Sequence, residues 1–437
     1  MAGMMDLINE LWFLPRNLVS DGYDQALNRL SQEVPMTIHE YPTGEPCWTW
    51  RVPEKWTCDE AYLESMDGRR IVDVKDHPLH VVSYSLPFEG VVNRQDLLPH
   101  LHTHITIPGA IPFVFKYYDR DWGLCVSEEV KNTLKDEQYR VVIRTRFEPG
   151  TLKVGETVIM GKSKESIMLV AHLCHPALAN DDMSGVAVGI QVAKALLAEA
   201  DRYYTYRLLI LPETIGSVAY LSHHEDLIPD MVGGLFLEIM GNDQPFALQH
   251  SFQPDSQPDL CFGSAIVGLS VSAQRAAYRR VIDNDERQFN APGVRVPMLS
   301  LSRVIPDKSH PHWPFVGYHS SYDTPDLLTE DRLREARDAV LGLLRAWENN
   351  QYVVNLFKGE IFCSGYNIWI DHQTNPSGHR RLFEIMERLD GTRTVADIAV
   401  ELNISFQSTW EVVSLLIDRG LAELSRGPMP TTPARKR

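Results

Sequence analysis

The stretch from Ser166 to Leu197 constrains the fold of this 437-residue chain more than any other. It opens with a short apolar run of strand length, and that run ends in His172, Cys174 and His175. An apolar run of this length predicts a buried strand. Imidazole and thiol groups at its carboxyl end are groups that bind metals or catalyse reactions.

An acidic loop and a helix follow this strand directly. The loop carries Asn180, Asp181 and Asp182, and residues 186–197 then place apolar side chains at helical spacing. In an open α/β sheet, ligands gather outside the carboxyl ends of the strands, which is where these residues fall. The alternative is that the two aspartates only cap the helix. A cap does not need two histidines at the preceding strand end, so we predict a site here.

Length and composition indicate a multidomain protein that does not bind nucleic acid. The chain is too long for one ordinary core, and its hydrophobic content is 44%. A formal net charge of −16 argues against DNA or RNA, which bind concentrated Lys and Arg. No apolar run could span a bilayer, no export signal is present, and the six cysteines are scattered. We expect a cytoplasmic protein with free thiols that acts on a small peptide or amide metabolite, with homo-oligomerisation left open.

Changes in sequence texture predict the domains. Residues 1–38 carry helical patterns that would pack on a neighbouring domain, and residues 39–137 are rich in β-branched and aromatic runs. Residues 138–355 alternate strand and helix patterns, as in an α/β domain. Residues 356–430 show helical patterns and a short strand that suit a winged helix, and residues 431–437 suit a disordered tail.

Two details of this prediction can be checked directly. Within the α/β part, residues 273–282 have apolar side chains at helical spacing and are expected to form a helix. In the winged-helix part, the last long helix carries Glu411 and Asp418 against Arg419. This charge balance is a poor match to DNA phosphates, so we expect protein contact or dimerisation there.

Two more predicted strands end in glutamate. Glu213 lies in LPETIGS and Glu238 in LFLEIMGND, and a later loop, YHSSYDTPD, contains His319. A hydrolytic zinc site needs His and carboxylate ligands, plus a carboxylate that moves protons. Each residue alone has a simple structural explanation as a cap or a solvated side chain. The set becomes a candidate zinc site if the sheet brings its members together: His172, Asp181, Glu213, Glu238 and His319.

Seven short motifs resemble those of cocatalytic zinc aminopeptidases, including the leucyl aminopeptidases and glutaminyl cyclases. In chain order they are HLC from His172, NDDMSG from Asn180, PETIGS from Pro212, LFLEI from Leu235, DERQF from Asp285, PGVRVP from Pro292 and YHSSYDT from Tyr318. The flanking runs, from YPTGEPCWTW to HLHTHITIPGAIPFV, are similar to the bacterial aminopeptidase-like domain family. The resemblance implies a three-layer α/β/α zinc-aminopeptidase-like domain with an inserted β-rich domain and a C-terminal winged-helix domain.

The resemblance also implies roles for individual residues. His172 and Glu238 match ligands of one zinc, and Asp181 matches the carboxylate that bridges two metals. His319 matches a ligand of the other zinc. Glu213 matches the general base, which takes a proton from water and passes it to the leaving amine.

Two positions depart from the family pattern. Cys174 stands where the family has an aspartate that orients the metal-binding histidine, and Thr214 stands where it has a glutamate ligand of the second zinc. Threonine is a poor zinc ligand. His175 lies in reach and is a possible replacement. We therefore expect one zinc and leave a second open.

The predicted function is zinc-dependent hydrolysis of an amide bond in a small peptide or aminoacylated metabolite. Asp285, Arg287, Arg303 and His250 lie beside matched motifs and are candidates for substrate binding. One alternative is a deacylase or amidohydrolase of a biosynthetic pathway that uses the same site. Another is a non-catalytic, ligand-binding pseudoenzyme that signals through the winged helix, although the retained Glu213 argues against it.

Overall fold

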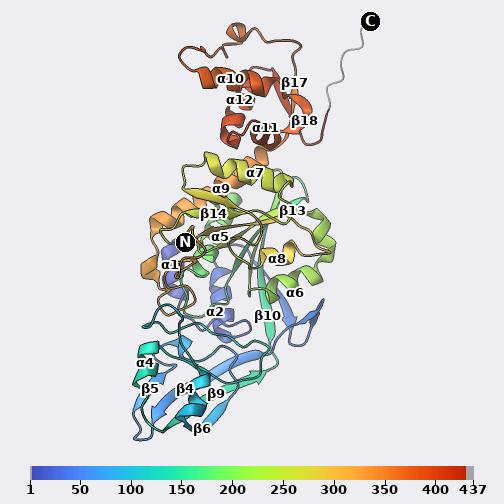
Figure 1. Cartoon of the computed structure of the whole chain (residues 1–437). Helices are drawn as coiled ribbons and strands as arrows, with labels where there is room; N and C mark the ends of the chain where they lie inside the picture. Colours follow the sequence, from blue (N-terminus) through green and yellow to red (C-terminus); the bar gives the residue numbers. More distant parts are fainter. Residues whose placement is uncertain (1, 430–437) are drawn as a thin grey trace. The chain divides into compact units, whose positions relative to one another are not determined.

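The computed structural model describes residues 2–429 and divides into two compact units (Figure 1). The first unit comprises the chain up to Ser251 and Ala276–Arg337, and the second comprises Phe252–Arg275 and the chain from Asp338 onward. The predicted domain boundaries do not coincide with this division and stay predictions. The predicted disordered tail, residues 431–437, lies outside the described residues. No helix within the described part of the chain has the length and hydropathy to cross a membrane.

A mixed sheet forms the centre of the first unit. Its strand order begins β1-β10-β12-β11-β13-β16-β14. The neighbours β12, β11, β13 and β16 run parallel, whereas β1, β10 and β14 pair antiparallel. The strands are β1 (Thr37–Pro42), β10 (Thr151–Ile159), β11 (Ser166–His172), β12 (Thr205–Leu211), β13 (Met231–Glu238), β14 (Phe246–Gln249) and β16 (Met298–Arg303).

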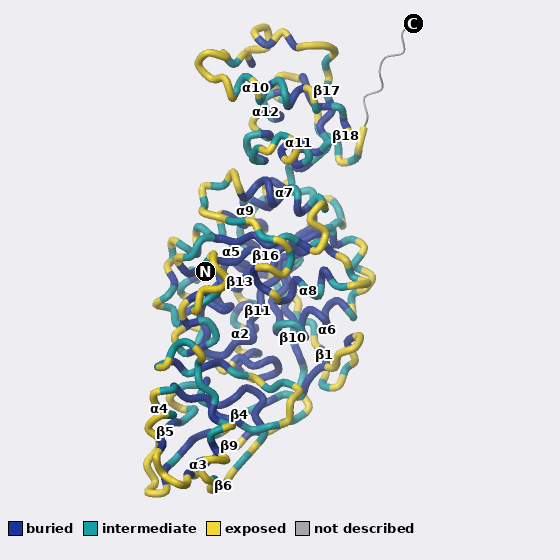
Figure 2. Tube along the Cα trace, in the orientation of Figure 1, coloured by how far each residue is buried: buried dark blue, intermediate teal, exposed yellow. Residues whose placement is uncertain are grey.

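The parallel strands form the core of this unit. Every residue of β11 is buried, and Figure 2 shows β11, β13 and β16 within the buried interior. A parallel strand covered on both faces carries a continuous apolar run. The opening strand predicted from the sequence is therefore confirmed.

Two groups of helices cover the sheet. α5 (Met183–Ala198) packs on β11 and β13 and against α1 (Met4–Leu11). α6 (Ile215–His223) packs on β10 and against α8 (Glu286–Phe289), which also contacts β16. α2 (Asp21–Leu30) is the second N-terminal helix, and α9 (Glu330–Asn349) follows the last strand of the parallel set. The alternation of strands and helices predicted for this part is confirmed.

The predicted helix over residues 273–282 is wrong. Ala273–Ala276 form a strand, β15, and turns follow it. Val281 and Ile282 are buried in a cluster with Ala247 of β14 and with Ile239, the residue after β13, and the Val281 N–H donates to Gln249 Oε1 at 2.7 Å. Tertiary contacts thus bury apolar residues whose spacing mimics a helix.

A β-rich module lies between β1 and β10 in the sequence. Its four-stranded antiparallel sheet has the order β5-β4-β9-β6, with β4 (Lys55–Ser65), β5 (Arg70–Asp73), β6 (Phe88–Asn93) and β9 (Gln138–Glu148). β9 falls on the α/β side of the predicted boundary at residue 137, yet it pairs with β4 and β6. Its buried and exposed residues alternate, as expected of a strand with one solvent-facing side. The smaller elements are β2 (Pro46–Cys47), β3 (Trp50–Arg51), β7 (Leu101–His102), β8 (Leu124–Cys125), α3 (Arg94–Leu97) and α4 (Glu128–Thr133).

The second unit combines helices with a three-stranded antiparallel sheet, β18-β17-β19. Its elements are α7 (Gln257–Ala265), α10 (Pro376–Met386), α11 (Val395–Glu401), α12 (Phe406–Asp418), β17 (Tyr352–Asn355), β18 (Asp390–Thr394) and β19 (Ala422–Ser425). The predicted helices and the short strand are confirmed, whereas the winged helix itself stays a prediction. α7 packs on α11 and α12, a long-range contact that the sequence did not indicate.

Candidate metal centre

The carboxyl ends of neighbouring strands bring the predicted site residues together. β11 ends in His172 and β13 ends in Glu238, while Glu213 follows β12. Asp181 lies in the loop that leads into α5, and His319 lies in the loop after β16. Because β12, β11, β13 and β16 are parallel neighbours, these ends meet at one edge of the sheet.

Asp181 lies between two histidines. Its Oδ1 is 3.1 Å from His172 Nε2, and its Oδ2 is 3.1 Å from His319 Nε2. The ligand atoms of His172, Asp181 and Glu238 lie within 4.8 Å of one another, and so do those of His175, Asp181 and His319. The cluster therefore contains two sets of potential ligands that share one carboxylate.

The set formed by His172, Asp181 and Glu238 has the chemistry of a cation-binding site. The side chains of His172, Asp181 and Glu238 are at most 1% exposed. Within the described chain, no hydrogen bond of good geometry satisfies Glu238 Oε2 or the oxygens of Asp181, whose near neighbours are the nitrogens of His172 and His319. Buried carboxylates with incomplete hydrogen bonding are costly, and imidazole and carboxylate are ligands that zinc prefers. These residues could hold a metal ion.

The cluster shifts the pKa values of its two buried histidines in opposite directions. Burial lowers the pKa of His172, but hydrogen bonds with Asp181, Cys174 and Glu238 outweigh burial and raise the net pKa well above its usual value. Burial lowers the pKa of His175 well below its usual value, so this imidazole is neutral. A neutral imidazole has a lone pair free for a metal.

Side chains of the acidic loop fix that loop against the end of β13. Asp182 caps α5, because its Oδ1 accepts the N–H of Gly185 at 3.0 Å, and the same oxygen accepts the N–H of Ile239 at 3.1 Å. Ser184 Oγ accepts the N–H of Met240 at 2.8 Å. Asp182 therefore caps the helix while its neighbour Asp181 faces His172 and His319.

A second buried carboxylate holds the backbone of Asp181. Asp323 accepts the N–H of Asn180 at 2.7 Å through Oδ1 and that of Asp181 at 3.0 Å through Oδ2. Asn284 donates to Glu238 Oε1 at 2.7 Å through Nδ2. These contacts orient both carboxylates of the cluster. Sequence reasoning missed Asp323, although it lies in the YHSSYDT motif, and missed Asn284 next to DERQF.

Glu213 is the member of the cluster that follows β12. Its Oε2 is 3.5 Å from His175 Nε2, and its side chain is 25% exposed. The next residue, Thr214, has a φ of 63°, which is rare for a β-branched residue. Asp285 Oδ1 accepts the Thr214 N–H at 2.8 Å and so holds this strained turn.

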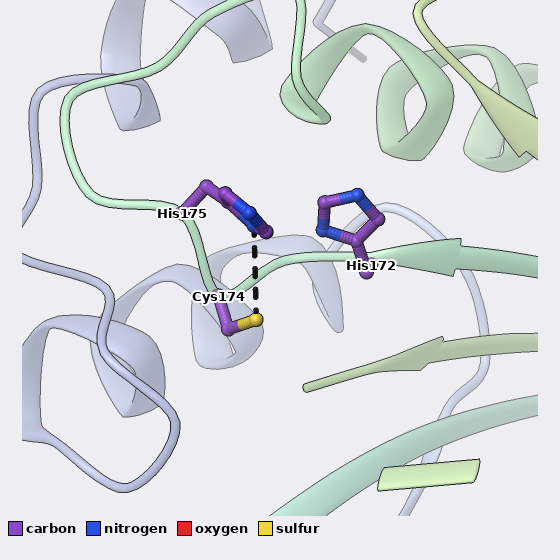
Figure 3. Close-up of side chains that lie close together, drawn as sticks. All are labelled: His172, Cys174 and His175. Atoms are coloured by element: carbon purple, nitrogen blue, oxygen red, sulfur yellow. Dashed lines mark hydrogen bonds between the residues drawn. The ribbon is translucent and has the colours of Figure 1, made fainter. Parts of the chain in front are cut away.

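Cys174 lies beside two histidines of the cluster. Figure 3 shows its sulfur directed toward His175, whose Nδ1 is 3.8 Å away, with His172 on the neighbouring part of the chain. The ligand atoms of these three residues fall within 4.8 Å of one another. Burial raises the pKa of the Cys174 thiol, which favours its protonated form. The other cysteines are free thiols too.

Comparison of the chain with known proteins shows the family to which it belongs. Residues 5–350 match the family model described as "Domain of unknown function (DUF4910)". The chain belongs to the DUF4910 family. A relative from Clostridium acetobutylicum, "Putative polysaccharide biosynthesis protein with aminopeptidase-like domain", is 31% identical over 409 residues, or 92% of each chain.

Solved structures show the fold that this DUF4910 chain shares. A "putative peptidase" from Clostridium acetobutylicum matches with a TM-score of 0.86 and 29% identity, covering 97% of this chain and 96% of that one. A zinc aminopeptidase from Bacillus subtilis matches with a TM-score of 0.58 and 12% identity, covering 78% and 93%. The fold is therefore aminopeptidase-like.

Thr214, one of the two residues of this DUF4910 chain that depart from the motif pattern, lies beside Arg287. Thr214 Oγ1 lies 3.4 Å from Arg287 Nη2, so this hydroxyl faces the guanidinium. His175 lies with Asp181 and His319 in one set of potential metal ligands.

The four substrate-binding candidates lie in different surroundings. Arg287 lines a cavity next to Glu213. Asp285 is buried behind Thr214, and Arg303 is buried in an ion pair with Glu335 and beneath the ring of Phe246. Neither of these residues, nor His250, lines the cavities beside the cluster. For these three, substrate binding is a prediction without a supporting position.

Arg16 is a further residue that sequence reasoning missed. Its guanidinium is fully buried and donates to the carbonyl of Leu173 at 2.6 Å and to that of Leu178 at 3.0 Å. The N-terminal segment thus braces the loop that carries His172 and Asp181. No local pattern could have revealed this, because the partners lie far apart in the sequence.

Proposed function

We propose that this DUF4910 protein is a zinc-dependent hydrolase that cleaves amide bonds in small molecules. The observation that carries the proposal is the pair of ligand sets sharing Asp181, with Glu213 3.5 Å from His175 at their side. His172, Asp181 and Glu238 would hold the first zinc, and His175, Asp181 and His319 would hold a second. The aminopeptidase-like fold is in agreement with this chemistry.

Each residue of the cluster has a distinct task in the proposed reaction. A zinc ion bound there would lower the pKa of a water molecule and polarise the amide carbonyl. Glu213 accepts the proton of the attacking water and hands it to the departing amine. Burial raises the pKa of Glu213, partly offset by His172, which makes the carboxylate a stronger base than a solvated one.

Metal analysis and a matched pair of variants test this proposal. Purified protein should contain zinc, lose amide hydrolysis with a chelator and regain it with added zinc. Glu213→Gln should retain the metal and lose activity by about 100-fold or more, as expected for the loss of a general base. Glu137→Gln, at an exposed position, is the control. Full activity of Glu213→Gln would exclude the assigned role.

A second candidate is deacylation in a biosynthetic pathway. The name of the Clostridium acetobutylicum relative places that protein in polysaccharide biosynthesis, which favours a non-peptide amide as the substrate here as well. The same cluster would act, and only the groups on either side of the amide would differ. For the second unit we infer the predicted winged helix with a role in protein contact.

A further inference from the structure

We propose that the site accepts an N-acylated amine whose acyl group is uncharged and whose amine part carries a carboxylate bound by Arg287. This inference rests on the proposed function and deepens it by naming the substrate class. It starts from the side chains through which the cluster reaches solvent. The four other members are at most 1% exposed, whereas His319 is 28% and Glu213 25% exposed.

Each of these two side chains lines a separate cavity. The His319 pocket has a volume of about 370 Å³, and the Glu213 pocket has a volume of about 420 Å³. One segment of the β-rich module borders both, with residues 112–114 at the first and residues 115–119 at the second. We place the amide of the substrate at the cluster, with one part of the molecule in each pocket.

The His319 pocket carries no charged partner for a free amine. None of its lining residues is Asp, Glu, Lys or Arg, and its surface comes from residues such as Ile105, Ile107, Phe113 and Trp313. Burying an ammonium group without a carboxylate partner is costly. A neutral aliphatic or aromatic acyl group fits this pocket better than an amino acid with a free α-ammonium.

The Glu213 pocket carries a cation with unused hydrogen-bonding capacity. Arg287 Nε donates to the carbonyl of Asn284 at 2.8 Å, and Nη2 lies 3.4 Å from Thr214 Oγ1, which fixes the guanidinium beside Glu213. Among the described residues, no carboxylate forms an ion pair with Arg287, whereas Lys116 in the same pocket pairs with Asp121. A planar guanidinium binds a carboxylate with two parallel hydrogen bonds.

The role of Glu213 decides which part of the substrate enters which pocket. The base returns its proton to the departing amine, so the amine part must lie on the Glu213 side. Trp50, Phe115 and Tyr118 line this pocket and are partly exposed, which suits an amine part with an apolar or ring-shaped body. The acyl part then lies on the His319 side. Water adds to the carbonyl carbon, the C–N bond breaks, and a carboxylic acid and a carboxylate-bearing amine are released.

Three substrates that differ by single groups test the inference. They are N-butanoyl-phenylalanine, its C-terminal carboxamide, and 2-aminobutanoyl-phenylalanine, which adds a free α-amine to the acyl part. With zinc-loaded protein, kcat/KM for the first should exceed each of the others by about tenfold or more, as expected for a charge-assisted pair. In Arg287→Gln, the ratio of acid to carboxamide should fall to near one, and Arg287→Lys should restore part of it. Arg280→Gln, exposed and outside both pockets, is the control.

The outcomes separate this inference from the proposed function. Faster hydrolysis of the free-amine substrate, or an unchanged acid-to-carboxamide ratio in Arg287→Gln, overturns the inference while amide hydrolysis stands. If zinc-loaded protein hydrolyses none of these substrates nor a wider panel of amides, the proposed function and the inference both fail.

Discussion

The sulfur of Cys174 accepts the backbone N–H of Glu213 at 3.1 Å. This bond joins the loop after β11, the strand that ends in His172, to the proposed base that follows β12. A thiol replaces the aspartate expected from the family resemblance. The sulfur is therefore placed to position Glu213.

Replacing Cys174 should affect both stability and activity. Cys174→Ala leaves the Glu213 N–H without its acceptor, which should lower the free energy of unfolding by about 1–3 kcal/mol. Misplacement of Glu213 should lower kcat by about tenfold or more. Urea denaturation and amide hydrolysis measure the two effects. Cys174→Ser should recover part of kcat, and Cys125→Ala, at a buried cysteine of β8, should change stability alone. Equal kcat losses in Cys174→Ala and Cys125→Ala would contradict a positioning role.

The two ligand sets should bind zinc with different affinities. The set of His172, Asp181 and Glu238 has two carboxylates, whereas the set with His175 and His319 has only the shared one. Glu238→Ala should therefore weaken the tightest zinc binding by about 100-fold, and His175→Ala should change it by less than about threefold. Competition with a chromophoric chelator measures both. Loss of the tightest zinc in His175→Ala would place His175 in the first set instead.

Arg16 should stabilise the loop between His172 and Asp181. Arg16→Met leaves the carbonyls of Leu173 and Leu178 unpaired in the interior, which should cost about 2–4 kcal/mol of unfolding free energy and weaken zinc binding. Arg146→Met is the matched control, because Arg146 is 56% exposed and its ion pair with Asp59 lies at the surface, so the substitution should cost less than about 1 kcal/mol. Thermal denaturation and zinc titration measure the difference. Similar losses of unfolding free energy and zinc affinity in both variants would show that the buried hydrogen bonds of Arg16 do not stabilise this loop.

Glu156, which lies outside the candidate site, should make the free energy of unfolding depend on pH. Burial alone raises its pKa, but hydrogen bonds from His39, Tyr220 and Arg207 outweigh burial and lower the pKa from 4.5 to about 2. A depressed carboxyl pKa stabilises the folded state above the unfolded pKa, and this contribution disappears as pH falls through the folded pKa. The window is therefore about pH 4.5 to 2.

The variant Glu156→Gln tests this window. It should lower the free energy of unfolding at pH 7 by about 3 kcal/mol, and the deficit should be about 1 kcal/mol smaller at pH 3.5. Urea titrations at the two pH values measure it. Glu40→Gln, at an exposed position of β1, is the control and should show a small deficit at pH 7. A deficit for Glu156→Gln that is the same at both pH values would refute the linkage.

Local pattern sufficed for the strands that build the site. The apolar runs before His172, Glu213 and Glu238 predict buried strands with polar ends, and the structure confirms these strands. This succeeds because a strand covered on both faces leaves a continuous apolar run in the sequence. The roles assigned to the three residues stay predictions.

Local pattern failed where burial comes from distant residues. The apolar spacing of residues 273–282 predicts a helix, but Val281 and Ile282 lie outside any helix and are buried by residues from other parts of the chain. The predicted boundary at residue 137 assigns β9 to the α/β part, although β9 pairs with β4 and β6 of the β-rich module. Neither the cluster around Val281 and Ile282 nor the pairing of β9 can be recognised from the spacing of apolar residues within the segment.

The sequence by itself determined an aminopeptidase-like α/β domain with a set of His, Asp and Glu residues at strand ends, because strand periodicity and motif order are local properties. Only the tertiary structure decided which side chains meet. It placed His175 beside Asp181 and His319, brought Cys174 to the Glu213 N–H, and set Arg287 at the Glu213 pocket. These contacts depend on strand order and on hydrogen bonds between loops far apart in the chain, which spacing along a sequence does not encode.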